Sequence, residues 1–284
     1  MENIKFNKNV LRVGKYAILK NGLAKGNGFR ILDTGNKYGC MSMKPSFYDE
    51  KMSDEEIKNL FLKHRKMAAK DNNYAFDPYK FYVPSQDGEG KAVELTREMV
   101  EACEDGWDLD IKGDILIVTN KTPRVVVGFP VADCPVVIAS DLKNGVTATA
   151  HCSAAMIDKY LPIRTVEALQ SKYDSKKEDI YVHIGAHASG DWTYDRRPSF
   201  ATESFWDKTG AIRQVKDDEY KIDLDKALLY QLNPLEYESF IINMADTLTN
   251  PNYYSNSVYN NDNSRKEKNG RHFEGVYYQK VKRL

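Results

Sequence analysis

The strongest constraint on the fold comes from the middle of the chain, where short stretches rich in β-branched residues alternate with turns. Five such stretches lie at 114–119, 124–128, 134–139, 145–151 and 179–185. Short β-branched runs bounded by turn residues are typical of strands. A later pair, at 239–244 and 275–280, has the same character. The chain is therefore predicted to bury β-sheet at its centre.

Helical patterns flank this region. Ser53 and Glu56 form a capping-box pattern ahead of apolar residues at helical spacing, which predicts a helix over 53–70. Further helices are expected at 154–173 and 223–232, whereas the asparagine-rich stretch 250–263 is typical of a loop. Helices separate only some of the strands. We therefore expect an α+β fold of mixed sheets packed together and flanked by helices, in a single domain over 1–284.

The charge balance limits the partners that this chain attracts. There are 41 Lys and Arg residues against 41 Asp and Glu residues, so the formal net charge is zero. We therefore do not expect nucleic acids or membranes as partners. We expect a small-molecule substrate. No apolar run reaches the about 20 residues that a membrane span needs, and residues 1–15 lack a signal-peptide pattern. We expect a cytoplasmic protein whose four cysteines are reduced thiols.

Chemistry is most concentrated where two of the predicted strands follow each other. The segment Val131-Ala-Asp-Cys-Pro135 leads into one strand, and the next strand ends at His151. Alternation along the second strand places His151 on the more polar face. Cys134 and His151 could together bind a soft metal ion, or His151 could convert Cys134 to a thiolate nucleophile. The alternative is a buried free cysteine beside a hydrogen-bonded histidine.

These residues carry a resemblance to a known family. The runs Gly113-Asp-Ile-Leu-Ile-Val-Thr119, Val131-Ala-Asp-Cys-Pro135 and Ala148-Thr-Ala-His151 resemble the core of the YfiH family. Weaker matches follow at Gly26-Asn27-Gly28-Phe29, Gln86-Asp87-Gly88, Asn250-Pro251, Ser257-Val258-Tyr259 and Gly270-Arg271. The resemblance implies a YfiH-like fold. It also implies the activity of proteins once described as multicopper polyphenol oxidoreductases or laccases, and now understood as zinc-dependent purine nucleoside phosphorylases with adenosine deaminase activity.

The resemblance also implies site residues, with departures. The family holds its metal through three ligands, of which Cys134 and His151 remain, while Gly88 stands at the third position. The resemblance therefore implies weak binding of zinc, which is favoured over copper, with His187 as the first candidate for a replacement ligand and Glu89, Asp87 and His183 behind it. Asp133 joins Cys134 and His151 as a predicted catalytic residue. Asn27, Arg196, Arg197 and Arg271 are the predicted substrate-binding residues.

Three functions are compatible with these residues. The first is a divergent YfiH-like enzyme acting on purine nucleosides. Its phosphorolysis should be weak, because Ala155 replaces a family arginine, unless Arg196, Arg197 or Arg271 restores the positive charge. The second is a Cys-His hydrolase or deamidase with Cys134 as nucleophile and His151 as base, by analogy with necrotising-factor toxins of similar architecture. The third is a non-catalytic paralogue that binds a ligand.

Overall fold

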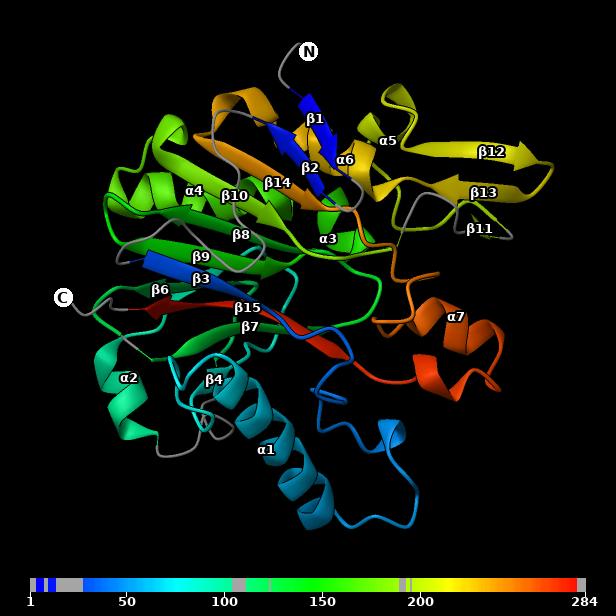
Figure 1. Cartoon of the computed structure of the whole chain (residues 1–284). Coiled ribbons are helices and arrows are strands. Elements are labelled where there is room, and N and C mark those ends of the chain that lie inside the picture. The colour runs from blue at the N-terminus through cyan, green and yellow to red at the C-terminus, as the bar shows by residue number, and fades with distance from the viewer. Residues whose placement is uncertain are drawn as a thin grey trace.

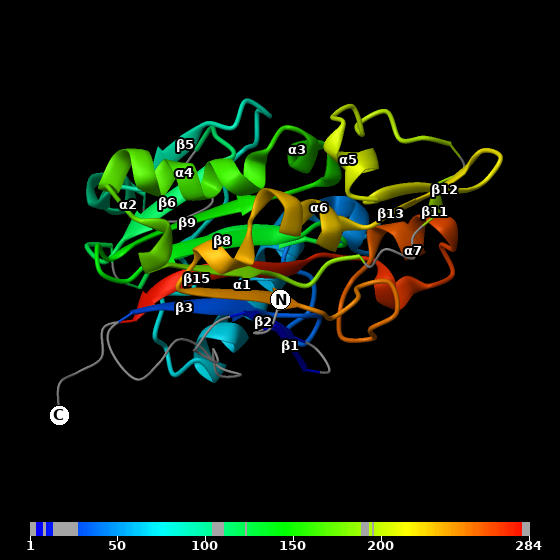
Figure 2. The ribbon, with the colours of Figure 1, turned by 90° about the horizontal axis from the view of Figure 1, so that it is seen from above.

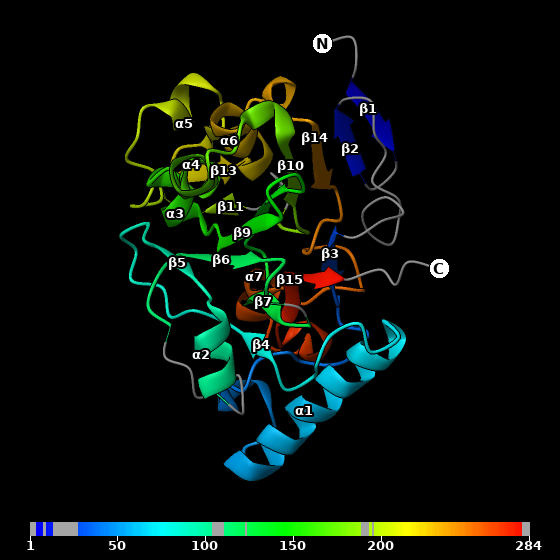
Figure 3. The ribbon, with the colours of Figure 1, turned by 90° about the vertical axis from the view of Figure 1, so that its left-hand side faces the viewer.

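Two β-sheets stacked face to face form the body of the protein, and helices cover both outer faces (Figure 1). The structure is a computed structural model that describes residues 4–7, 10–13, 28–103, 111–122, 124–188, 193–194 and 196–279. Seen from the side, the layers run helices, sheet, sheet, helix (Figure 3). The predicted α+β class, with mixed sheets and flanking helices, is confirmed.

The larger sheet has eight strands. In spatial order they are β1 (Ile4–Asn7), β2 (Val10–Val13), β14 (Ser239–Asn243), β10 (Ile180–Ile184), β8 (Val136–Asp141), β9 (Val146–His151), β6 (Ile115–Thr119) and β5 (Ala92–Glu94). The central strands β10, β8, β9 and β6 pair antiparallel, whereas β10 with β14 and β5 with β6 pair parallel. The pairs β1 with β2 and β2 with β14 are also antiparallel, so the predicted mixed sheet contains only two parallel pairs among the described strands.

The smaller sheet packs against the larger one. Its four strands, in spatial order, are β3 (Gly28–Asp33), β15 (His272–Gln279), β7 (Val126–Val131) and β4 (Phe81–Tyr82). Apolar side chains from both sheets fill the space between them, among them Leu116, Val118, Ile138, Val127, Phe129, Val131 and Val276. Burying these side chains on both sheets is the main force that holds the sheets together.

Helices close the two outer faces. The helices α3 (Ala154–Asp158), α4 (Leu161–Tyr173) and α6 (Leu224–Gln231) lie across the larger sheet (Figure 2). The helix α1 (Asp54–Asp71) covers the smaller sheet, and its predicted capping box between Ser53 and Glu56 is present. The single helix predicted over 154–173 is wrong. It divides because Tyr160 has a left-handed backbone with φ 62° and Pro162 starts the second helix.

The remaining elements lie at the periphery. A third sheet contains β11 (Thr193–Tyr194), β13 (Glu219–Ile222) and β12 (Ile212–Lys216), and the short helices are α2 (Arg97–Ala102), α5 (Phe205–Lys208) and α7 (Asn256–Asn261). The prediction that 250–263 is entirely loop is wrong, since Ser255 caps α7. Among the described residues, no helix is both long enough and apolar enough to span a bilayer.

Candidate functional site

Cys134 and His151 lie at the neighbouring ends of two paired strands, as expected. β9 ends at His151, which stands opposite Val136, the first residue of β8. The amide of Cys152 donates a hydrogen bond of 2.9 Å to the carbonyl of Pro135 and extends this pairing by one step. Cys134 therefore sits in the turn that leads into β8, beside the end of β9.

Asp133 holds that turn in place. Its backbone has φ 78°, a left-handed conformation that needs support from its surroundings. One carboxylate oxygen accepts a 2.7 Å hydrogen bond from the hydroxyl of Thr247, and the other accepts a 2.7 Å bond from the amide of Ser257. The carbonyl of Asp133 accepts a further bond from the amide of Ala188. This geometry makes Asp133 a positioning residue for Cys134, because both of its carboxylate oxygens are engaged.

Gln86 fixes the tautomer of His151. The side-chain amide of Gln86 donates a 3.1 Å hydrogen bond to the carbonyl of His151, which defines the orientation of that amide because a carbonyl can only accept. The amide oxygen of Gln86 then faces Nδ1 of His151 at 2.8 Å, so Nδ1 carries the proton. Burial, and then the charge of Arg271, lowers the pKa of His151 to about 4. His151 is therefore a neutral imidazole at pH 7 with its lone pair on Nε2.

Cys134 is a protonated thiol in this environment. Its side chain is only partly exposed, and burial, followed by the charge of Asp133, raises its pKa to about 12. Arg271 opposes this rise. A thiolate nucleophile requires the opposite balance, with the thiol pKa lowered towards neutrality. Tyr194 of β11 lies near Cys134 and Asp133. Burial raises the pKa of Tyr194, and the charges of these two residues raise it further.

Arg271 brings a fixed positive charge to this pair. It precedes β15, where His272 pairs with Val131, so Arg271 lies opposite Ala132 and near the turn that carries Cys134. Its guanidinium stacks on the ring of Phe47 at 4.6 Å and donates a 3.0 Å hydrogen bond to the side chain of Asn256. The charge of Arg271 acts on both Cys134 and His151. Of the predicted arginines, Arg271 is the one that the structure brings to the pair.

The other predicted substrate-binding residues do not join this arrangement. Arg197 makes two hydrogen bonds to the carboxylate of Asp207, at 2.9 and 2.8 Å, and has the role of an exposed ion pair. Arg196 is exposed on the surface. Asn27 lies outside the described residues. The structure thus offers no support for substrate contacts by Arg196 or Arg197.

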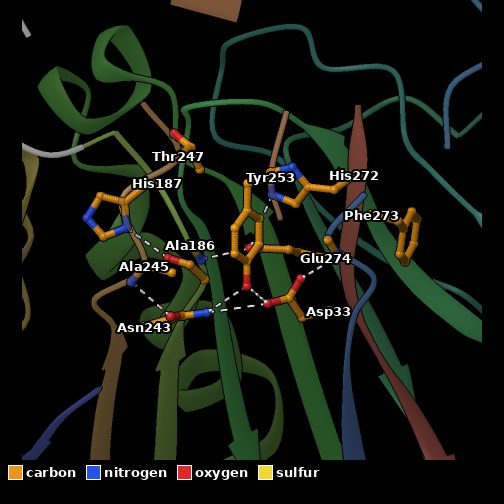
Figure 4. Close-up of polar contacts among 12 residues, drawn as sticks. Asp33, Ala186, His187, Asn243, Ala245, Thr247, Tyr253, His272, Phe273 and Glu274 are labelled. Carbon is orange, nitrogen blue, oxygen red and sulfur yellow. Dashed lines mark hydrogen bonds and ion pairs between the residues drawn. The ribbon is translucent and has the colours of Figure 1, made fainter. Parts of the chain in front are cut away.

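His187 is wrong as a replacement metal ligand. It is buried, and both ring nitrogens have other partners: Nε2 lies 2.9 Å from a carboxylate oxygen of Asp225, and Nδ1 lies 2.8 Å from the carbonyl of Gly185. Figure 4 shows His187 beside Ala186, in the polar cluster between the sheets. The candidate Asp87 is exposed and accepts a bond from the amide of Glu89.

The side chains present do not fit a three-ligand metal centre. Within the described ranges, no three His, Cys, Asp or Glu side chains are placed to hold one ion. Cys134 and His151 would supply two donors to a zinc ion, which usually takes four. Gly88, at the position of the missing ligand, provides no side chain.

The fold is a two-sheet α+β architecture in which Cys134, His151 and Arg271 lie where β8 and β15 begin and β9 ends. A family model described as "Multi-copper polyphenol oxidoreductase laccase" matches residues 63–279. The chain belongs to this family.

Individual proteins also resemble this chain in sequence or in structure. Purine nucleoside phosphorylases of Mycobacterium tuberculosis and Mycobacterium bovis are 25% identical over 136 residues, which is 48% of this chain and 54% of theirs. The chain thus matches about half the length of these relatives. The crystal structure of YlmD from Geobacillus stearothermophilus superimposes with a TM-score of 0.66 at 15% identity, covering 98% of this chain and 99% of that one. YfiH of Bacillus licheniformis gives 0.61 at 17% identity over 78% and 81% of the two chains.

Two contributors to the site were not among the predicted site residues. Gln86 was recognised as part of a sequence match, but its two hydrogen bonds to His151 depend on a contact across 65 positions. Asp114 precedes β6 and is fully buried, with its carboxylate bound by the amides of Gly88 and Gly90. The sequence does contain a signal for Asp114, because it is a charged residue directly before an apolar strand.

Proposed function

We propose that this protein catalyses phosphorolysis of purine nucleosides, with His151, Arg271 and Cys134 in the active site. The observation that carries the proposal is the neutral His151, whose Nε2 lone pair is exposed to the field of the Arg271 guanidinium. A fixed cation beside a neutral base suits a reaction in which an anion is bound and then attacks. The names of the mycobacterial relatives support the same class of substrate.

The proposed reaction assigns a role to each group. The guanidinium of Arg271 binds inorganic phosphate, and Nε2 of His151 accepts the proton of a phosphate hydroxyl. The phosphate oxygen forms a bond to C1′ of the ribose while the bond from C1′ to N9 breaks and its electron pair moves to the purine. The protonated His151 then returns the proton to the leaving base, so the products are ribose 1-phosphate and the free purine. The uncharged side chain of Cys134 packs beside the ribose.

Contacts with the protein fix the orientation of the Arg271 guanidinium, which supports its proposed role in binding phosphate. One nitrogen donates to the carbonyl of Gly270 at 2.7 Å and another to Asn256 at 3.0 Å. A guanidinium has five N–H donors, and the other three make no hydrogen bond to the part of the chain that the structure describes. Stacking on Phe47 holds the plane of the group, which reduces the entropy lost when phosphate binds.

The electrostatics of Cys134 favour phosphorolysis over the Cys-His hydrolase alternative. With a thiol pKa of about 12, the thiolate fraction at pH 7 is very small. Neutral side chains at both positions suit a site that receives a dianion from solution.

The test is a panel of purine nucleosides incubated with the purified protein, with and without phosphate. We expect release of free base and ribose 1-phosphate from adenosine or inosine only when phosphate is present. Ammonia released from adenosine without phosphate would instead indicate deamination. An inert panel, together with rapid alkylation of Cys134 by iodoacetamide at pH 7, would contradict phosphorolysis and favour the cysteine nucleophile. The exposed Arg196→Ala variant is the control for Arg271→Ala.

A further inference from the structure

We propose that this site functions without a resident metal ion, and that a backbone clamp around Gly88 replaces the ligand that the family's metal needs. The proposal deepens the function proposed above, but it rests on the geometry of the loop 86–90 and on the cations around it. Zinc content is measured without substrate, so this inference and the proposed phosphorolysis can fail separately.

Side chains from three neighbouring elements hold the loop. The buried carboxylate of Asp114 accepts hydrogen bonds from the amide of Gly88 at 3.1 Å and from the amide of Gly90 at 2.6 Å. The ammonium of Lys159 donates to the carbonyl of Gly88 at 2.9 Å, and Arg164 donates to the carbonyl of Glu89 at 3.2 Å. Four backbone groups of the loop are thus satisfied by protein alone. These hydrogen bonds hold the loop whose Gln86 contacts His151.

The conformation of Gly88 disfavours any side chain at this position. Its φ is +78°, which L-residues rarely adopt. A Cβ built on Gly88 would lie 3.3 Å from the ammonium of Lys159. A histidine would therefore begin from a strained backbone and meet a positive charge. Glycine is the residue that fits both the turn and the contact with Lys159.

The charge around the site also opposes a metal ion. Lys159 is held at Gly88, and Arg271 lies opposite Ala132, two residues from Cys134. Each carries a positive charge that would repel a divalent cation bound by Cys134 and His151. The carboxylate of Asp133, which precedes Cys134 in the chain, is turned towards Thr247 and Ser257. A site with only two side-chain donors for zinc and two nearby cations is better suited to an anion than to zinc.

The experiment measures zinc retained by the full chain after incubation with zinc chloride and gel filtration, using elemental analysis. We expect at least about a tenfold shortfall from one zinc per chain, because two protein ligands leave half of a tetrahedral shell to water. We also expect the rate of Cys134 alkylation to stay the same when zinc or a chelator is added.

The proposal is overturned if the wild-type protein retains one zinc per chain and loses it in both Cys134→Ala and His151→Ala. The matched control is His64→Ala, which removes the imidazole that contacts the carbonyl of Cys40. Zinc that is lost equally in this control would be bound elsewhere, which would support the proposal. Protection of Cys134 from alkylation by zinc would contradict it even if a variant failed to fold.

Discussion

Two polar clusters lie at the same end of the two sheets, and they differ in what surrounds them. The site contains Cys134, His151 and Arg271. The second, here called the buried cluster, contains Asp33, Tyr253, His272 and Glu274, with Asn243 beside them (Figure 4). Both include a histidine whose pKa burial lowers to about 4. A histidine near charged groups is therefore not enough to identify the functional site.

The innermost residues of the buried cluster are closed off from solvent. His272 and Glu274 are 0% and 1% exposed, and His272 Nε2 lies 3.4 Å from a carboxylate oxygen of Glu274. The amide of Ala186 donates a 2.7 Å hydrogen bond to Glu274. A side chain at Gly185 would overlap Glu274, since a Cβ there would lie 1.4 Å from its carboxylate oxygen. Burial, and then the charge of Asp33, raises the pKa of Glu274 well above its usual range.

The site differs from the buried cluster in two ways: a fixed positive charge lies near its histidine, and that histidine is held in one tautomer. At the site, Gln86 determines which nitrogen of His151 carries the proton, and Arg271 supplies charge to a pair that is partly exposed. In the buried cluster, neither ring nitrogen of His272 has a hydrogen-bond partner among the described residues. The first arrangement can act on a ligand, whereas the second affects stability.

The largest effect should come from removing the imidazole of His151, in comparison with removing that of His272. His151→Ala should lower the phosphorolysis rate by a factor of about 10² to 10⁴, because it removes the proposed general base. Its thermal midpoint should change little. His272→Leu should leave the rate within about twofold and should not lower the midpoint, since a buried imidazole without hydrogen bonds costs free energy in the folded state. Rates and melting curves of both variants check this, and the reverse pattern would contradict it.

Asp133→Ala should be the next largest effect. It removes the acceptor for the hydroxyl of Thr247 and the amide of Ser257. We expect the free energy of unfolding to fall by about 2 to 4 kcal/mol, because the buried hydroxyl of Thr247 and the half-buried amide of Ser257 lose their charged partner. Urea denaturation measures the change. Asp87→Ala is the control, since that carboxylate is exposed, and an equal loss in both variants would refute the special role of Asp133.

Removal of the side chain that orients His151 should have a moderate effect. Gln86→Leu should lower kcat/KM by about 10-fold to 100-fold, the size seen when the partner of a functional histidine is lost. Gln86→Glu should raise the pKa of His151, because a carboxylate stabilises the imidazolium. The acidic limb of the pH profile should then move to higher pH. If the limb stays in place in this variant, Gln86 does not position the base.

Glu274→Gln should have the smallest effect, and its sign depends on pH. The raised pKa of Glu274 means that folding favours the protonated carboxyl. The stability from that preference is complete below the unfolded pKa of about 4.3 and is lost as the pH rises through the folded pKa. The variant should therefore become more stable than the wild type by about 1 to 2 kcal/mol at pH 8, with little difference near pH 4. Urea denaturation at both pH values measures this, and a difference that shrinks as pH rises would contradict it.

Local sequence patterns predicted much of the fold. The capping box at Ser53 and the β-branched runs near β6, β9 and β10 describe contacts between near neighbours, and these elements lie close to the predicted bounds. Elements held by distant partners were missed. β3 pairs with β15 some 240 positions later in the chain, so nothing adjacent to β3 in the sequence marks it as a strand. The break between α3 and α4 did have a local signal, Pro162, which the helix predicted over 154–173 ignored.

The site was predictable where it lay in one segment. Cys134 precedes β8 and His151 ends β9, the next strand and its antiparallel partner, so their proximity follows from the short connection between those strands. His187 was wrong because its partner Asp225 lies 38 residues away, and that contact is set by how α6 packs on the sheet. Arg271 could not be chosen over Arg197 for the same reason, since the ion pair of Arg197 with Asp207 appears only in the folded chain.

The central claim is that Arg271 supplies the charge on which the reaction depends, and the most direct measurement is the phosphate dependence of base release from inosine. Arg271→Ala should lower kcat/KM for phosphate by a factor of about 10² to 10³, as expected when a donor to a developing charge is removed. Arg271→Lys should recover part of this loss, because it keeps the charge without the paired donors. Arg196→Ala should match the wild type. Unchanged phosphate dependence in Arg271→Ala, or a wild-type protein that releases no base, would contradict the claim.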